Sequence, residues 1–77
     1  MSHKTLDTLV MMANQIARNM MIQGEERALP QISEHIRLYW DPRMRKAIDA
    51  HLDAGGEGLD DLARRALTAL RDERAAS

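Results

Sequence analysis

Apolar residues recur every three or four positions along most of the chain, the spacing that places them on one face of an α-helix. Between residues 5 and 22 this face comprises seven positions: Leu6, Leu9, Val10, Ala13, Ile16, Ala17 and Met20. The same spacing predicts three more helices, over residues 29–39, 42–53 and 60–71, followed by a flexible tail over residues 72–77. No segment alternates apolar and polar residues as a strand does. We therefore predict an all-α fold, in which residues 1–77 form a single helical domain, a small compact bundle of four short amphipathic helices.

The breaks between these helices carry capping residues. Asp41 precedes Pro42, and this pair predicts a helix start, because the carboxylate can accept from free amides of the first turn where proline needs no donor. Gly55 or Gly56 is the expected left-handed cap at the end of the same helix. Asp60 is the expected cap of the last helix. We assign these five residues to helix boundaries rather than to chemistry.

Three large apolar residues fall outside the predicted buried faces, namely Met11, Ile22 and Leu38. At about 100° per residue, Met11 and Ile22 lie together on the side of the first helix opposite its apolar face. They are either ordinary exposed apolar side chains, which are common on protein surfaces, or contacts for a partner. On the second helix, either Tyr39 or Trp40 completes the buried face.

The corner over residues 40–45 gathers the only tryptophan, two arginines and a methionine. Tryptophan and arginine are enriched among the residues that anchor protein interfaces, and methionine suits adaptable contacts. Helix capping does not account for this gathering. We therefore hypothesise a partner-binding surface that comprises Trp40, Arg43, Met44 and Arg45 together with Met11, Ile22 and Leu38.

Length and composition narrow the function classes. A domain of 77 residues buries only about 60% of its unfolded-chain surface, so support from a partner or a second copy is expected. The chain has no cysteine, which excludes disulfides, thiolate metal sites and cysteine nucleophiles. Eleven basic and twelve acidic residues, spread evenly, argue against a dedicated nucleic-acid or membrane binder. Neither a transmembrane run nor a signal peptide is evident, so we expect a cytoplasmic protein.

The residues offer no catalytic, cofactor or metal site. The three histidines, at positions 3, 35 and 51, form no pair at helical spacing, and two histidines alone do not complete a zinc site. The glycine-rich stretch over residues 55–58 lacks the preceding strand and the following lysine of a phosphate loop, so helix capping explains it better.

Two other functions stay open on the residues alone. A small helical DNA-binding regulator could use the helix over residues 42–53. This helix contains Arg43, Arg45 and Lys46, and Arg37 lies shortly before it in the sequence. A free-standing homodimeric interaction module could bury the first helix against a second copy. The even charge disfavours the first of these alternatives.

Two motif regions resemble one known family. The stretch over residues 35–45 reads His-Ile-Arg-Leu-Tyr-Trp-Asp-Pro-Arg-Met-Arg, and His51 and Ala-Gly-Gly-Glu-Gly-Leu over residues 54–59 follow it. Near the N-terminus, residues 12–17 read Met-Ala-Asn-Gln-Ile-Ala. With these motifs the chain resembles the delta subunit of molybdenum-containing, NAD-dependent formate dehydrogenases, from roughly Leu6 to Leu70.

The resemblance implies a non-catalytic accessory subunit of a soluble complex. In that family, the alpha subunit carries molybdenum bound by two pterin guanine dinucleotides, together with iron–sulfur clusters, and oxidises formate. Beta and gamma subunits pass the electrons through FMN and further clusters to NAD. The resemblance implies no cofactor in this chain and makes the alpha subunit its expected partner, with beta and gamma in the complex. It leaves open whether the delta subunit is permanent or leaves after maturation, and whether it forms a homodimer when isolated.

Overall fold

The computed structural model describes the backbone of residues 2–76 and the side chains of residues 5–73. Over this range the chain forms four α-helices, a short 3-10 helix and no strand, which confirms the predicted all-α fold. The elements are α1 (Ser2–Met20), the 3-10 helix η1 (Met21–Gln23), α2 (Glu25–Tyr39), α3 (Pro42–Asp53) and α4 (Asp61–Ala76). The radius of gyration of 11.5 Å matches the roughly 11–12 Å expected of a compact domain of this length.

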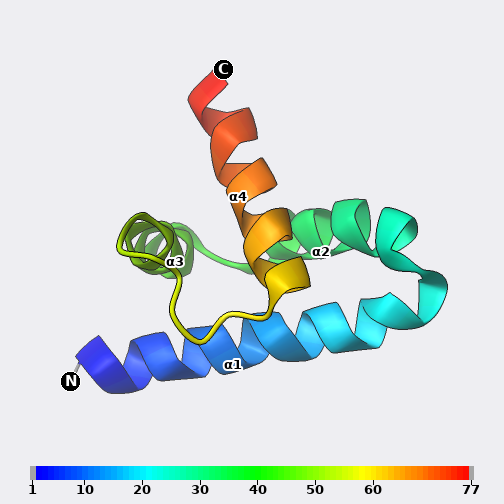
Figure 1. The fold of residues 1–77 in the computed structure, drawn as a ribbon. Helices are drawn as coiled ribbons and strands as arrows, with labels where there is room; N and C mark the ends of the chain where they lie inside the picture. Colours follow the sequence, from blue (N-terminus) through cyan, green and yellow to red (C-terminus); the bar gives the residue numbers. More distant parts are fainter. Residues whose placement is uncertain (1, 77) are drawn as a thin grey trace.

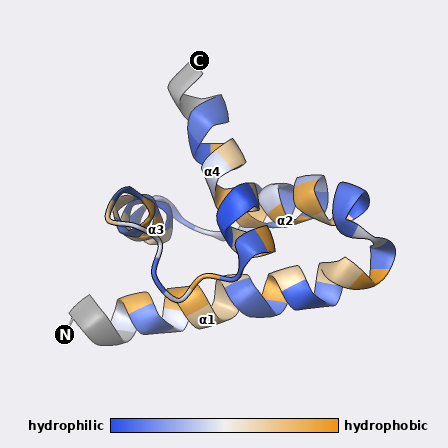
Figure 2. Cartoon of the chain, viewed as in Figure 1, coloured by the Kyte–Doolittle hydropathy of each residue, from blue (hydrophilic) through white to orange (hydrophobic). Residues whose placement is uncertain are grey.

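Helices α1 and α2 run antiparallel and pack side by side, joined through η1 (Figure 1). Helix α4 crosses them steeply, and α3 lies beyond the C-terminal end of α2. The connection from α3 to α4 passes over α1 (Figure 1), so α1 contacts all three other helices. Apolar and polar positions alternate around each helix (Figure 2), as the amphipathic pattern predicts.

Buried side chains from all four helices and from the α2–α3 corner meet in one core. Alanines occupy many of these positions on α1, α2 and α4, which lets the helix backbones approach closely. One buried polar group joins two helices: Ser33 Oγ on α2 donates to the Ala66 carbonyl on α4 at 2.9 Å. The core residues are Leu9, Ala13, Ala17, Ala28, Ile32, Ile36, Trp40, Ile48, Leu62, Ala63, Ala66, Leu67 and Leu70.

The start of α2 differs from the prediction. The helix begins at Glu25 rather than at residue 29, so Pro30 lies inside the helix and not in its first turn. Proline removes one backbone hydrogen bond from a helix interior, but here packing offsets that loss. Ala28 is fully buried in the core, and the Glu25 carboxylate accepts from Arg65 Nη1 on α4 at 2.6 Å. This hydrogen bond and the charge of Glu25 raise the pKa of the Arg65 guanidinium.

The other helix ends also shift. Helix α1 begins at Ser2 instead of residue 5, and the α-helix ends at Met20, with η1 tightening the chain before Gly24. Helix α4 begins at Asp61 and continues to Ala76, so the flexible tail expected from residue 72 is helical in its described part. Within that part, Arg37 Nη2 on α2 donates to the Glu73 carboxylate at 2.8 Å, a contact that sequence spacing does not reveal.

Candidate docking surface

The corner between α2 and α3 is built as the Asp41-Pro42 pair predicts. Asp41 is the N-cap of α3, its carboxylate accepting from the Met44 amide at 3.0 Å, and Pro42 is the first helical residue. Trp40 ends α2 with an extended backbone, φ −90° and ψ 128°. Because the Trp40 backbone is not helical, its side chain does not point in the direction that the helical period of α2 predicts.

The extended backbone turns the Trp40 side chain into the core. Trp40 is only 5% exposed, whereas Tyr39 is 70% exposed, so the structure resolves which of the two completes the buried face. Its indole Nε1 is buried and has no hydrogen-bond partner among the described residues. Buried tryptophan N–H groups usually find an acceptor, and an unmatched donor costs about 1–3 kcal/mol. Trp40 is therefore a core residue, and its indole N–H makes no hydrogen bond to the described residues.

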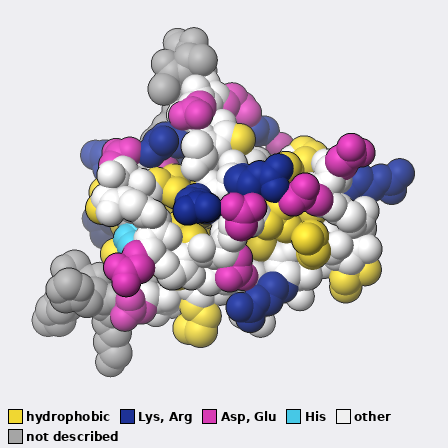
Figure 3. Space-filling model, in the orientation of Figure 1, with side chains coloured by type: hydrophobic (Ala, Val, Ile, Leu, Met, Phe, Trp, Pro, Cys, Tyr) yellow, Lys and Arg dark blue, Asp and Glu magenta, His cyan; other side chains and the backbone are white. Residues whose placement is uncertain are grey.

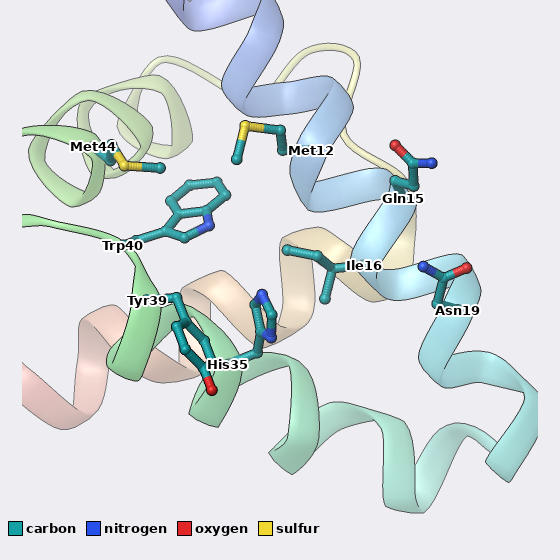
Figure 4. Close-up of a pocket in the computed structure, with 8 residues that line it drawn as sticks. All are labelled: Met12, Gln15, Ile16, Asn19, His35, Tyr39, Trp40 and Met44. Atoms are coloured by element: carbon teal, nitrogen blue, oxygen red, sulfur yellow. The ribbon is translucent and has the colours of Figure 1, made fainter.

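One edge of the Trp40 ring lines an open depression between α1, α2 and α3, with a volume of about 340 Å³ (Figure 4). Met12 and Ile16 point from α1 toward the indole in this view, and Met44 approaches it from α3. Tyr39 packs against His35 at the other side, with ring centroids 4.8 Å apart. We call this depression the Trp40 pocket; its lining residues are Met12, Gln15, Ile16, Asn19, His35, Tyr39, Trp40 and Met44.

The sequence reasoning missed most of this pocket. Two i,i+4 pairs carry the signal that could have found it, one on α1 and one on α2. Met12 and Ile16 form the first pair, and His35 and Tyr39 form the second. Each pair places two side chains of the pocket on one strip of its helix.

The three apolar residues that fell outside the predicted faces are exposed. Ile22 is 89% exposed, Leu38 64% and Met11 61%. A second depression of about 540 Å³ runs along α1 beside Met11 and shares Gln15 and Asn19 with the Trp40 pocket. The two hollows therefore adjoin. Met11 borders the second hollow, and Tyr39, exposed at the rim of the Trp40 pocket, is a surface residue that the prediction did not include.

The basic residues near the corner do not form one cluster. Arg43 is exposed and Arg45 is half-buried, like Met44 between them. Arg37 instead bridges two acids, donating to Glu34 at 2.6 Å and to Glu73 at 2.8 Å. Arg37 thus joins α2 to α4, which leaves less positive charge at the corner than the DNA-binding alternative assumes. On the face shown in Figure 3, basic and acidic side chains are intermixed, with no area of one sign.

The glycine turn after α3 has a structural role. Gly56 N donates to the His51 carbonyl at 2.8 Å and Gly55 N to the Leu52 carbonyl at 3.1 Å, which is the Schellman arrangement of helix ends. Both glycines have positive φ, +119° for Gly55 and +66° for Gly56. The turn also binds His51 Nε2, which lies 2.6 Å from the Glu57 carbonyl.

Asn14 fixes this turn to α1. Its Nδ2 donates to the Gly58 carbonyl at 2.9 Å, and its Oδ1 accepts from the Asp60 amide at 2.8 Å. Asp60 occupies the N-cap position of α4, because its carbonyl accepts from the Arg64 amide, while its carboxylate accepts from Arg18 Nε. Sequence reasoning missed this role of Asn14, although the residue lies within the N-terminal motif.

Among residues 5–73, no group of three histidine, cysteine, aspartate or glutamate side chains is placed to hold a metal ion. Within the same part of the chain, no helix is long and apolar enough to cross a membrane.

A family model described as NADH-dependent formate dehydrogenase delta subunit FdsD matches residues 8–67 of the chain. The chain belongs to this family. The matched range contains Asn14, the α2–α3 corner and the glycine turn, so the resemblance first carried by these motifs is confirmed. No curated protein and no solved structure matches the chain.

Proposed function

We propose that the chain is a non-catalytic accessory subunit that binds the cofactor-bearing part of an NADH-dependent formate dehydrogenase and supports its assembly or stability. The observation that carries this proposal is the match to the delta subunit family over residues 8–67. A subunit of this size has a small core, and docking onto a larger partner would bury surface that the chain cannot cover itself.

In this proposal the other subunits hold the redox chemistry. The molybdenum with its two pterin guanine dinucleotides, the iron–sulfur clusters and FMN belong to them, and the alpha subunit is the direct partner. The absence of cysteine supports this division, because iron–sulfur clusters are held by cysteine thiolates. The complex acts in the cytoplasm.

The contact face in this proposal lies on α1 and on the C-terminal end of α2. Met11 is exposed and lines the second hollow along α1, Leu38 is exposed near the C-terminal end of α2, and Ile22 is exposed on the 3-10 helix. Exposed large apolar side chains rimmed by polar ones are typical of protein interaction sites. Arg43, Met44 and Arg45 extend this face onto α3.

Co-expression of the other formate dehydrogenase subunits with and without this chain tests the proposal. We expect the chain to co-purify with the alpha subunit, and its omission to lower the yield of assembled enzyme per mole of alpha subunit. Retention of the chain in the active complex would identify a permanent subunit, and retention only in cofactor-poor complex a maturation role. Absence of co-purification, with equal yield of assembled enzyme, would contradict the proposal.

A matched pair of variants tests the contact face. Met11→Gln combined with Leu38→Gln removes two exposed apolar side chains without disturbing the core. The control is Met21→Gln, at a methionine that is also exposed but lies beside Asp60 and Leu62 at the start of α4. We expect the double variant to lose most of its co-purification, at unchanged helicity, and the control to retain it.

A further inference from the structure

Helix α3 carries basic residues at the end where its dipole disfavours them. The N-terminus of a helix is electropositive, so it is stabilised by acidic side chains and destabilised by basic ones. Helices α2 and α4 follow this rule, because acidic residues occupy the first turn of each. The first turn of α3 has no acidic residue, and its first five residues include Arg43, Arg45 and Lys46. We call these three residues the α3 cations; their placement costs α3 stability instead of adding to it.

The α3 cations also lack the ion pairs that other arginines of the chain form. Among the described residues they make no salt bridge, and the nearby carboxylate of Asp41 accepts instead from the Met44 amide. The only other described arginine or lysine without an ion pair is Arg27 on α2. The arginines that do pair with acidic side chains are Arg18, Arg37, Arg64, Arg65 and Arg71. The positive charge of α3 is thus not neutralised within the described chain.

Two of the α3 cations share one exposed strip of the helix. Arg43 and Lys46 are three positions apart, the spacing at which side chains are neighbours on a helix surface, and both are exposed. Like charges at this spacing repel each other, and carboxylates placed beside them would relieve that repulsion. Ala50, one turn further along the strip, is also exposed, and its small side chain lets a partner approach the helix. Arg45 is half-buried on the neighbouring side.

The size and surroundings of the strip favour an acidic polypeptide over a nucleic acid. Two cations about one helical turn apart match two carboxylates of one segment, whereas a nucleic-acid binder spreads its cations over many phosphates. The chain has a net charge of −1, and Asp53 ends α3, so a long polyanion would meet repulsion beyond the strip. Leu38 and Tyr39, both exposed, end α2 just before this corner and add apolar contact of the kind found in protein interfaces.

We infer that Arg43 and Lys46 bind carboxylate side chains of an acidic segment on a partner subunit, so that the contact made by α3 is ionic. This inference rests on the proposed function, which supplies the partner, and it adds the chemistry of the partner surface. The docking surface then has an apolar part on α1 and α2 and a cationic part on α3. Because exposed ion pairs are screened by salt, the association depends on salt.

Neutralisation of the two cations tests the inference through two separate effects. Arg43→Gln and Lys46→Gln, separately and together, remove charges that oppose the helix dipole, so we expect the melting temperature of the free chain to be equal or higher. Each single variant should lose about two- to fivefold in affinity for the other subunits at low salt, and the double variant should be less sensitive to added salt. The control is Arg27→Gln, which removes an exposed, equally unpaired arginine from the first turn of α2 and should retain the native affinity.

Cross-linking identifies the chemistry of the partner surface directly. A carbodiimide activates a carboxylate and joins it to a contacting amine through an amide bond, without a spacer. Lys46 is one of only two lysines in the chain, so mass spectrometry can assign a cross-link that starts from it. We expect Lys46 to be joined to an aspartate or glutamate side chain of another subunit. Lys46→Arg retains the positive charge, so it should bind normally and lose this cross-link.

The outcomes separate this inference from the proposed function. If the native chain does not associate with the other subunits, the proposed function fails, and the inference fails with it. If the native chain associates but the neutralised variants bind equally tightly at low salt, or Lys46 forms no cross-link to a carboxylate, only the inference is overturned. A lower melting temperature of the free double variant would also overturn it, because the cations would then serve the fold. Binding to duplex DNA that the double variant loses, with subunit association unchanged, would assign the strip to nucleic acid instead.

Discussion

Asn14 and Asp60 lie 46 positions apart in sequence, yet the Asn14 side chain binds the Asp60 amide at 2.8 Å. The same carboxamide donates to the Gly58 carbonyl at 2.9 Å, so one residue of α1 uses both of its polar atoms on the turn that leads into α4. Nothing in the apolar pattern requires this contact. These two hydrogen bonds explain why α1 has a polar residue, Asn14, directly after the buried Ala13: the side chain holds the turn in place.

Loss of this clamp should destabilise the fold. Asn14→Ala removes both hydrogen bonds and leaves the partly buried Asp60 amide without its acceptor, so we expect a loss of about 1–3 kcal/mol in the free energy of unfolding. Urea unfolding followed by circular dichroism measures it. Gln15→Ala, at the adjacent exposed position, is the control and should change stability by less than about 0.5 kcal/mol. Equal losses in the two variants would contradict the role given to Asn14.

Trp40→Ala should unfold much of the protein rather than detach a partner. The residue is almost fully buried, and removal of a large core side chain costs about 3–5 kcal/mol, a large part of the stability of a small domain. Tyr39→Ala, one residue earlier and largely exposed, should cost less than about 1 kcal/mol. Thermal unfolding followed at 222 nm separates the two variants. A cooperative transition of Trp40→Ala at the native temperature would show that the indole is not part of the core.

Asp41→Ala should destabilise the start of α3. The substitution removes the acceptor for the Met44 amide, and the loss of an N-cap costs about 1 kcal/mol. Asp41→Asn retains an oxygen acceptor at the same place and should recover most of that stability. The comparison uses urea midpoints at constant pH, and equal losses in both variants would point to charge instead of capping.

Arg37→Ala should have a small effect that depends on salt. Its guanidinium bridges Glu34 and Glu73, but all three side chains are substantially exposed, and exposed ion pairs contribute less than about 1 kcal/mol each. We expect the difference in unfolding free energy between native chain and variant to shrink when urea titrations are repeated at high salt. A loss that is large and independent of salt would mean that packing of the arginine stem dominates.

The parts of the fold that follow from local rules were predictable. The 3.6-residue period identifies the helices, and Asp41 followed by Pro42 places the start of α3 at the residue where the structure has it. The glycine turn likewise follows from the need for positive φ at Gly55 and Gly56. These features depend on residues close in sequence, which is why a single chain reveals them.

The parts that depend on distant residues were not predictable. The start of α2 is set by the burial of Ala28 and by Glu25 meeting Arg65, which outweigh the local effect of Pro30. The inward turn of Trp40 follows from its extended backbone at the end of α2, where the helical period no longer applies. The Trp40 pocket combines residues of three helices. The i,i+4 pairs each mark a strip on α1 or α2, but no spacing along the chain shows that these strips meet each other and α3.

The clamp between Asn14 and residues 58–60 also sets an order of events during synthesis. Helix α1 leaves the ribosome before the turn to which it is fastened, because residues 58–60 are translated more than forty residues later. Until Asp60 has emerged, the apolar side of α1 has neither its hydrogen-bonded clasp nor α4 to cover it. The nascent subunit therefore exposes part of the apolar side of α1 until residues 58–60 and α4 have been synthesised.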